Sequence, residues 1–299
     1  SSGGAAAALA AGLTGLEIGG DIGGSSRNPA HYGGGSGHKP TYKLVGATRA
    51  AAPGNPAETD LNVSGPLARS AEDLSVAMQY LAGPGLLDMA GWRPTLPPPT
   101  KQLRDYRVAI WPNDNRVAVA AEISDRCQLL ADKLARLGAT VSDSARPKVD
   151  TAHSTRVYRQ LLDAATNPLT TLAHREWHLL DSERIKIRTQ WREYFKDWDI
   201  VICPIAATAA FKHDRRAFNE RRLDVEGQSV SYFQQLFWAG LVTVGFLPST
   251  AFPTGVNKDG LPIGLQAFGK AYDDLITIDF VRLLSKEIGE FVAPPGFSD

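Results

Sequence analysis

Apolar residues along the chain follow two kinds of spacing, one typical of strands and one of helices. The continuous apolar run at 199–206 (DIVICPIA) predicts a central buried strand, and the run at 106–112 predicts another. After the second run, one apolar helix face is predicted over 119–137, followed by a short strand at 139–143. Because strand, helix and strand follow in that order, we expect a βαβ unit on a parallel sheet and an α/β fold. The apolar helix face consists of Ile123, Cys127, Leu130, Leu134 and Leu137.

Further elements are predicted on both sides of this unit. The sequence SAED at 70–73 is a capping box and predicts the start of a helix. The stretch 93–100 (RPTLPPPT) is rich in proline and is the one internal domain boundary that we consider. The other expected elements are a helix over 5–12 capped by Ser2, a strand at 16–20, Gly-rich and Pro-rich loops at 32–41 and 46–60, helices over 151–198 interrupted at 167–168, an aromatic helix over 232–245, and a final helix from Asp273 to Ile288.

Composition and charge narrow the classes of function. The 299 residues are 43% hydrophobic, with 32 basic and 32 acidic side chains, so the net charge is zero and no nucleic-acid partner is expected. No apolar run approaches the roughly 20 residues that span a bilayer, so we expect no membrane partner and a cytoplasmic protein. Cys127 and Cys203 lie in apolar segments and are expected to be buried, without a disulfide or a metal.

Two serine–glycine segments, SSGG at 1–4 and GGSS at 23–26, carry the candidate chemistry. A serine hydroxyl becomes a strong nucleophile when a neighbouring group takes its proton. A Gly-rich turn brings backbone N–H groups close to the oxyanion that forms when such a serine attacks a carbonyl. In DIGGS, Ser25 ends a run of such amides, with Asp21 and Arg27 beside it as structural anchors. The simpler interpretation is a flexible surface loop.

The order and spacing of several motifs resemble the amidase signature family, across essentially the whole chain. They are SSGG, GxDIGGSxRxP at 19–29, GxKPT at 37–41, GPLARSAEDL at 65–74, DIVICPIAATAAF at 199–211, FWAGL at 237–241 and GLPIGLQAFG at 260–269. The resemblance implies an α/β fold with a large mixed β-sheet covered by helices on both faces. It implies hydrolysis of a small-molecule carboxylic amide to an acid and ammonia or an amine, without metal or organic cofactor.

The same resemblance assigns roles to residues. It implies a triad of serine, cis-peptide serine and lysine, with Ser25 as the nucleophile and Ser1 as the bridging serine that relays its proton. Ser2 supports them by hydrogen bonding. Ser26 is the alternative nucleophile, and Ser25 is preferred because the family alignment places an apolar residue at position 26. The amides of Ile22, Gly23, Gly24 and Ser25 form the oxyanion hole.

The family's lysine lies upstream of SSGG, in a segment that this sequence does not include. Lys39 matches the GxKPT turn instead and is expected to anchor that loop, while Lys43 is expected at the surface. We therefore expect 1–299 to be a single amidase-signature domain lacking the N-terminal segment: a fragment, one part of a nicked enzyme, or a shortened form. Its isolated activity is expected to be low, and the missing segment, as a separate chain, is a candidate partner.

Several alternatives stay open. His174 and His178 are four residues apart on a helix, but no third metal ligand is evident, so an amphipathic helix face is preferred. Ser1 as an N-terminal nucleophile, or GGSS as a phosphate loop, fits the pattern less well. The aromatic helix either packs the core or lines an acyl pocket. The main alternative function is a non-catalytic or amidotransferase-like subunit, and a homodimer is left open.

Overall fold

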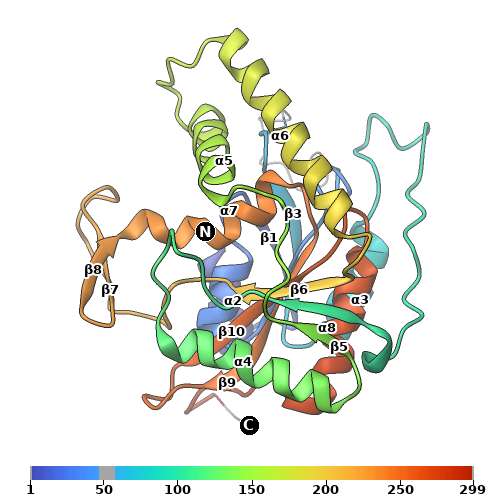
Figure 1. Cartoon of the computed structure of the whole chain (residues 1–299), viewed down its shortest axis with the longest axis vertical. Coiled ribbons are helices and arrows are strands. Elements are labelled where there is room, and N and C mark those ends of the chain that lie inside the picture. Colours follow the sequence, from blue (N-terminus) through green and yellow to red (C-terminus); the bar gives the residue numbers. More distant parts are fainter. Residues whose placement is uncertain (1, 47–57, 298–299) are drawn as a thin grey trace.

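The computed structural model describes residues 2–46 and 58–297 and contains a mixed β-sheet of eight strands (Figure 1). The neighbours β5, β4 and β6 are parallel, and each of the remaining neighbouring pairs is antiparallel. The mixed sheet predicted from the family resemblance is therefore confirmed. In spatial order the strands are β1 (Leu16–Asp21), β3 (Val63–Ala68), β2 (Ser36–Lys39), β9 (Ser249–Val256), β10 (Pro262–Phe268), β6 (Ile200–Pro204), β4 (Arg107–Ile110) and β5 (Thr140–Ser142).

Helices cover both faces of this sheet, and β7 (Arg222–Val225) and β8 (Gln228–Ser231) form a separate hairpin. In Figure 1, α5 and α6 lie beside each other and extend beyond the sheet, with the hairpin projecting from another side. None of the helices within the described residues has the length and apolar character that a bilayer span requires. The helices are α1 (Gly3–Ala10), α2 (Arg27–Gly33), α3 (Ala71–Leu81), α4 (Ala121–Arg136), α5 (Thr151–Thr166), α6 (His174–Tyr194), α7 (Leu236–Val244) and α8 (Asp274–Ile288), with 3₁₀ turns at Leu103–Asp105 and Tyr232–Gln235.

Two apolar cores form because successive side chains of a strand point to opposite faces. On β4, Val108 and Ile110 pack into the core shared with α3, α4 and α8. The alternate residue Ala109, and Trp111 just beyond the strand, pack into the core shared with α5, α6 and α7. A strand buried on both faces has no polar side to alternate with, which explains the continuous apolar runs in the sequence.

The predicted βαβ unit is confirmed as β4, α4 and β5. Cys127 is fully buried on the predicted face of α4, and Cys203 is fully buried in β6, which lies inside the sheet. The predicted helix start at SAED is confirmed as well, since Ser70 Oγ accepts a hydrogen bond from the Asp73 amide at 3.1 Å. The proline-rich stretch 93–100 contains neither helix nor strand, and the domain boundary there stays a prediction.

Two local predictions were wrong, and a third is largely untested. The segment 32–41, predicted as a loop, contains β2, a strand inside the sheet. Its sequence, SGHK, has no apolar residue, and it is stable there because distant groups satisfy its polar side chains: His38 contacts Thr250 Oγ1 at 3.0 Å and Asp274 Oδ1 at 3.1 Å. Ser2 stands at the start of α1 but makes no side-chain cap. Most of the loop expected at 46–60 lies outside the described residues.

Candidate functional site

The candidate site is the turn that joins the end of β1 to the start of α2. Asp21 is the last residue of β1, and Ser26 immediately precedes α2. Between them Gly24 has a φ of +89°, a conformation that favours glycine, and an added Cβ would lie 2.7 Å from Asn28 Oδ1. The GGS segment is therefore a tightly packed turn and not the flexible surface loop of the simpler interpretation.

A buried ion pair holds this turn in place. Asp21 and Arg27 are both fully buried, and the guanidinium donates to both carboxylate oxygens, at 2.9 and 3.0 Å. Burial alone would raise the pKa of Asp21, but the charge and hydrogen bonds of Arg27 outweigh it and hold the pKa at about 2. Arg27 also donates to Gln266 Oε1 at 2.8 Å and to Thr243 Oγ1 at 3.2 Å. The pair thus ties the turn to β10 and α7.

The two neighbouring serines have different environments. Ser26 is fully buried, and its hydroxyl donates to Asp21 Oδ2 at 2.8 Å. Ser25 is only partly buried. The amide of Ser2 donates to the Ser25 carbonyl at 3.0 Å, so the two serine–glycine segments meet in space. Ser1 lies outside the described residues. Of the two serines, Ser25 is thus the more exposed residue.

The amides of the turn fall into two groups. The Gly24 N–H donates to Asp21 Oδ1 at 2.9 Å, so this member of the predicted oxyanion hole is already engaged. Within the part of the chain that the structure describes, the N–H groups of Ile22, Gly23 and Ser25 have no acceptor. Three of the four predicted donors therefore have no protein acceptor among the described residues, and their role in an oxyanion hole stays a prediction.

Sequence analysis did not single out Tyr158, which packs against the turn from α5. Its hydroxyl donates to the Ile22 carbonyl at 2.9 Å. A Cβ added to Gly23 would lie 3.1 Å from the Tyr158 hydroxyl and 3.0 Å from Leu236 Cδ2 on α7. No sequence signal marks Tyr158, because it lies 136 positions from its acceptor.

The aromatic helix packs the core, one of the two roles considered for it, and the acyl-pocket role stays a prediction. Trp238 and Phe237 of α7 are buried in the core with α5 and α6. The start of the helix also lines a cavity of about 260 Å³. Leu236 and Tyr158, which lie against Gly23, belong to its lining, and no described residue of the turn does. The other residues lining it are Arg116, Val117, Thr155, Arg159, Ser231, Phe233, Gln234 and Phe237.

We expect Gly240→Ala to destabilise the protein by about 1–3 kcal/mol, because extra atoms in a packed core force neighbours to move. The new Cβ would overlap the Tyr158 ring and would displace the side chain that holds Ile22. Urea unfolding measures this change. The matched control is Gly4→Ala in α1, where no atom lies within 4 Å and a gain of up to about 1 kcal/mol is expected. An equal gain in the free energy of unfolding in both variants would contradict the prediction.

The two lysines considered from sequence lie where they were expected. Lys39 is buried, and its Nζ donates to the carbonyls of Leu247 at 2.8 Å and Pro40 at 2.9 Å, as a loop anchor would. Burial, together with the nearby charge of Arg27, lowers the pKa of Lys39 to about 7. Lys43 is at the surface, 3.5 Å from Glu58.

His31 on α2 makes the stability of the fold depend on pH. It is buried, its Nδ1 accepts from the Gly264 amide at 2.6 Å, and its Nε2 donates to the Thr208 carbonyl at 3.0 Å. These bonds require a neutral ring, because a protonated Nδ1 cannot accept. Burial lowers the pKa of His31 to about 4 from its ordinary value of 6.5.

Between pH 6.5 and 4, the unfolded chain therefore binds a proton at His31 that the folded protein excludes. The stability contributed by His31 is complete above pH 6.5 and is lost as the pH falls toward 4, by up to about 1.4 kcal/mol per pH unit. We expect the difference in unfolding free energy between the natural protein and His31→Gln to shrink over this range. Urea unfolding at several pH values measures it, and a constant difference would contradict the prediction.

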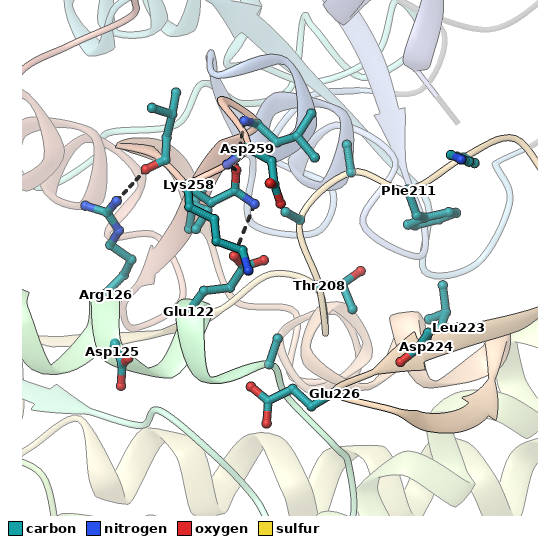
Figure 2. A pocket seen from close by; sticks show the side chains of 18 of the residues that line it. Glu122, Asp125, Arg126, Thr208, Phe211, Leu223, Asp224, Glu226, Lys258 and Asp259 are labelled. Carbon is teal, nitrogen blue, oxygen red and sulfur yellow. Dashed lines mark hydrogen bonds between the residues drawn. The ribbon is translucent and has the colours of Figure 1, made fainter.

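A second cavity, of about 1310 Å³, lies between the start of α4, the β7–β8 hairpin and the tip of the β9–β10 hairpin (Figure 2). Many of its charged side chains already have partners: Arg126 donates to the Thr254 and Val256 carbonyls, and Glu122 accepts from Asn257. None of the site residues predicted from sequence is among its described lining residues.

His174 and His178 are exposed on α6, which agrees with an amphipathic helix face. Across residues 2–46 and 58–297, no group of three or more histidine, cysteine or acidic side chains is arranged to hold a metal ion.

Comparison with known proteins gives consistent matches. The sequence profile of the family described as Amidase matches residues 1–176 and 170–277. One relative is a glutamyl-tRNA(Gln) amidotransferase subunit from Alkaliphilus metalliredigens, which is 25% identical over 99% of this chain and 68% of its own length. The corresponding protein from Anaeromyxobacter sp. (strain K) is 26% identical with the same coverage.

Solved structures show the same fold. A 6-aminohexanoate cyclic dimer hydrolase has a TM-score of 0.79 at 22% identity and covers all of this chain and 70% of its own. A bacterial aryl acylamidase of the amidase signature enzymes has a TM-score of 0.78 at 20% identity, covering 96% of this chain and 65% of its own. The fold predicted from the motifs, the amidase signature fold, is confirmed.

Proposed function

This chain belongs to the amidase family, and from that premise we propose that it hydrolyses a small-molecule carboxylic amide through an acyl-serine intermediate on Ser25. The observation that carries the proposal is the turn at 21–26. A partly exposed hydroxyl lies beside three amides without acceptors in the described part of the chain, and a buried ion pair fixes the backbone between them. Preorganised N–H groups of this kind stabilise the charge that develops on a carbonyl oxygen under attack.

In the proposed reaction, Ser25 Oγ attacks the amide carbonyl carbon and gives up its proton. The negative charge that forms on the substrate oxygen is stabilised by the amides of Ile22, Gly23 and Ser25. The C–N bond then breaks, the nitrogen takes a proton and leaves as ammonia or an amine, and an ester to Ser25 remains. Water attacks this ester, and the acid and the free hydroxyl are released.

The proton needs an acceptor, and we propose that Ser1 relays it to the family's lysine. Lys39 is not proposed for this role, because its Nζ is hydrogen-bonded to the carbonyls of Pro40 and Leu247, neither of which belongs to the turn. Ser2, whose Oγ donates to the Gly20 carbonyl at 3.3 Å, would hold the segment carrying Ser1 against the turn. The family resemblance places this lysine upstream of SSGG, and we propose that a segment of the same or a separate chain supplies it. This dependence implies weak turnover by residues 1–299 alone.

A serine-directed fluorophosphonate, followed by peptide mapping of the full-length protein, tests this proposal. We expect the label on Ser25 and none in the Ser25→Ala variant. Labelling confined to another serine would overturn it. A catalytic serine is labelled because its hydroxyl is activated, whereas ordinary surface serines are inert.

The second candidate is an amidotransferase-like subunit, favoured by the name of the relatives that match 99% of the chain. Such a subunit would pass ammonia to an acceptor held by a partner. Ammonia release from simple amides in water, by the purified full-length protein alone, would favour the hydrolase. Release that requires a partner protein and an acceptor would favour the amidotransferase role.

A further inference from the structure

The cavity beside the turn has a distinctive lining. It holds about 260 Å³, below the usual range for a drug-sized ligand, so it fits one small substituent of a substrate. Its apolar wall is formed by Phe233, Leu236 and Phe237, from the segment that starts α7. Leu236 and Tyr158 also lie against the Gly23 region of the turn, so the cavity lies next to the turn and the two share these side chains.

Two arginines line the same cavity. Arg159 comes from α5, with its guanidinium carbon 5.1 Å from the centre of the Phe233 ring. Arg116 comes from the loop between β4 and α4. Within the residues described, neither guanidinium forms an ion pair or donates a hydrogen bond to a carboxylate.

Two carboxylates near Arg116 accept hydrogen bonds from backbone amides. The bonds to Asp150 lower the pKa of that carboxyl, and the charge of Arg116 contributes to this lowering. Asp114 Oδ1 accepts from the Arg116 amide at 3.0 Å, and Asp150 accepts from the amides that begin α5, at 2.9 and 3.2 Å. The cavity therefore offers two guanidinium groups and an apolar wall, with no acidic side chain among its described lining residues. Guanidinium groups bind carboxylates strongly because their paired N–H donors match the two oxygens.

From this juxtaposition we propose that the substrate is an amide whose acyl group carries a carboxylate, separated from the reacting carbonyl by an apolar spacer. The spacer packs on Phe233, Leu236 and Phe237, and Arg159 and Arg116 bind the carboxylate. In a primary amide the leaving group is ammonia, so the carboxylate of such a substrate lies on the acyl side, and primary amides are therefore used in the test. This inference rests on the proposed hydrolysis at Ser25.

The test compares matched pairs of primary amides on the full-length protein: 4-carbamoylbenzoate with 4-methylbenzamide, and adipamate with hexanamide. We expect kcat/KM to be at least about 10-fold higher for the anionic member of a pair. Arg159→Met keeps the apolar stem and removes the charge. It should raise KM for the anion about 10- to 100-fold and leave the neutral amide within about twofold. Arg116→Met should act in the same direction.

The control is Arg156→Met, which removes the same charge from the exposed side of α5 without touching the cavity. It should leave both substrates unchanged, since a general electrostatic effect would appear in it too. A neutral amide turned over as well as its anionic partner, with Arg159→Met affecting neither, would overturn the carboxylate proposal and leave the hydrolysis intact.

A binding measurement separates the two proposals. Calorimetric titration of 4-carbamoylbenzoate into Ser25→Ala protein needs no turnover. Binding that Arg159→Met weakens, without hydrolysis of any amide by the natural protein, would support the anion site and refute the hydrolysis. If 4-carbamoylbenzoate did not bind and the natural protein did not prefer anionic over neutral amides, the carboxylate proposal would be overturned.

Discussion

Ser25→Ala is expected to lower amide turnover by about 10⁴-fold or more, the size of effect seen when a catalytic serine is removed from a hydrolase. The substitution removes the hydroxyl that we propose forms the acyl intermediate. Stability should change by less than about 0.5 kcal/mol, because the side chain is partly exposed and bonds to no other described residue. Ammonia release and urea unfolding, measured on the same preparations, give both numbers.

Ser26→Ala is the matched control. It is expected to lower the stability and to leave part of the turnover, the opposite of Ser25→Ala. The Ser26 hydroxyl is buried against Asp21, so its loss should cost about 1–3 kcal/mol of stability. Turnover should persist at a reduced level, since the nucleophile remains. If Ser26→Ala abolished hydrolysis while Ser25→Ala retained it, the two serines would have to exchange roles.

Arg27→Met should destabilise the protein by about 3–5 kcal/mol, the cost of leaving one member of a buried ion pair without its partner. Asp21 would then be a carboxylate with no counter-ion at a fully buried position. Replacing both residues, as Asp21→Asn with Arg27→Met, should cost less than the sum of the two single changes. Urea unfolding of the three variants measures the coupling, and additive effects would contradict it.

The pH dependence of the same variants gives an independent check. In the natural protein the pKa of Asp21 is about 2, below its ordinary value of 3.8. Its stabilising contribution is therefore complete above pH 3.8 and is lost as the pH falls toward 2. In Arg27→Met, burial raises the pKa of Asp21 instead, so this variant should gain stability relative to the natural protein as the pH falls and the carboxyl protonates.

Predictions from sequence succeeded where the signal was local. The apolar face of α4 and the two-sided burial of β4 and β6 follow from residue spacing, because a helix or strand repeats over a few residues. The turn at 21–26 was identified from its glycines and from its place among the family motifs. Its conformation depends on residues next to one another in the chain, as the positive φ of Gly24 shows.

Predictions failed where a residue depends on a distant partner. Strand β2 was missed because its polar sequence is stabilised by Thr250 and Asp274, more than 200 positions away. No sequence pattern singles out Arg116, Arg159 or Tyr158. Each is an ordinary surface or helix residue until α5 packs against α7.

The sequence by itself determined the family and the position of the turn, because these are encoded by short-range order, and it supplied the proposal that the hydroxyl at position 25 is the nucleophile. The tertiary structure alone decided which of the turn's amides stay free, since the Asp21 carboxylate takes one of them. It also decided which side chains lie beside the turn. The cavity there is lined by segments far apart in the sequence, and no local sequence pattern predicts that they meet.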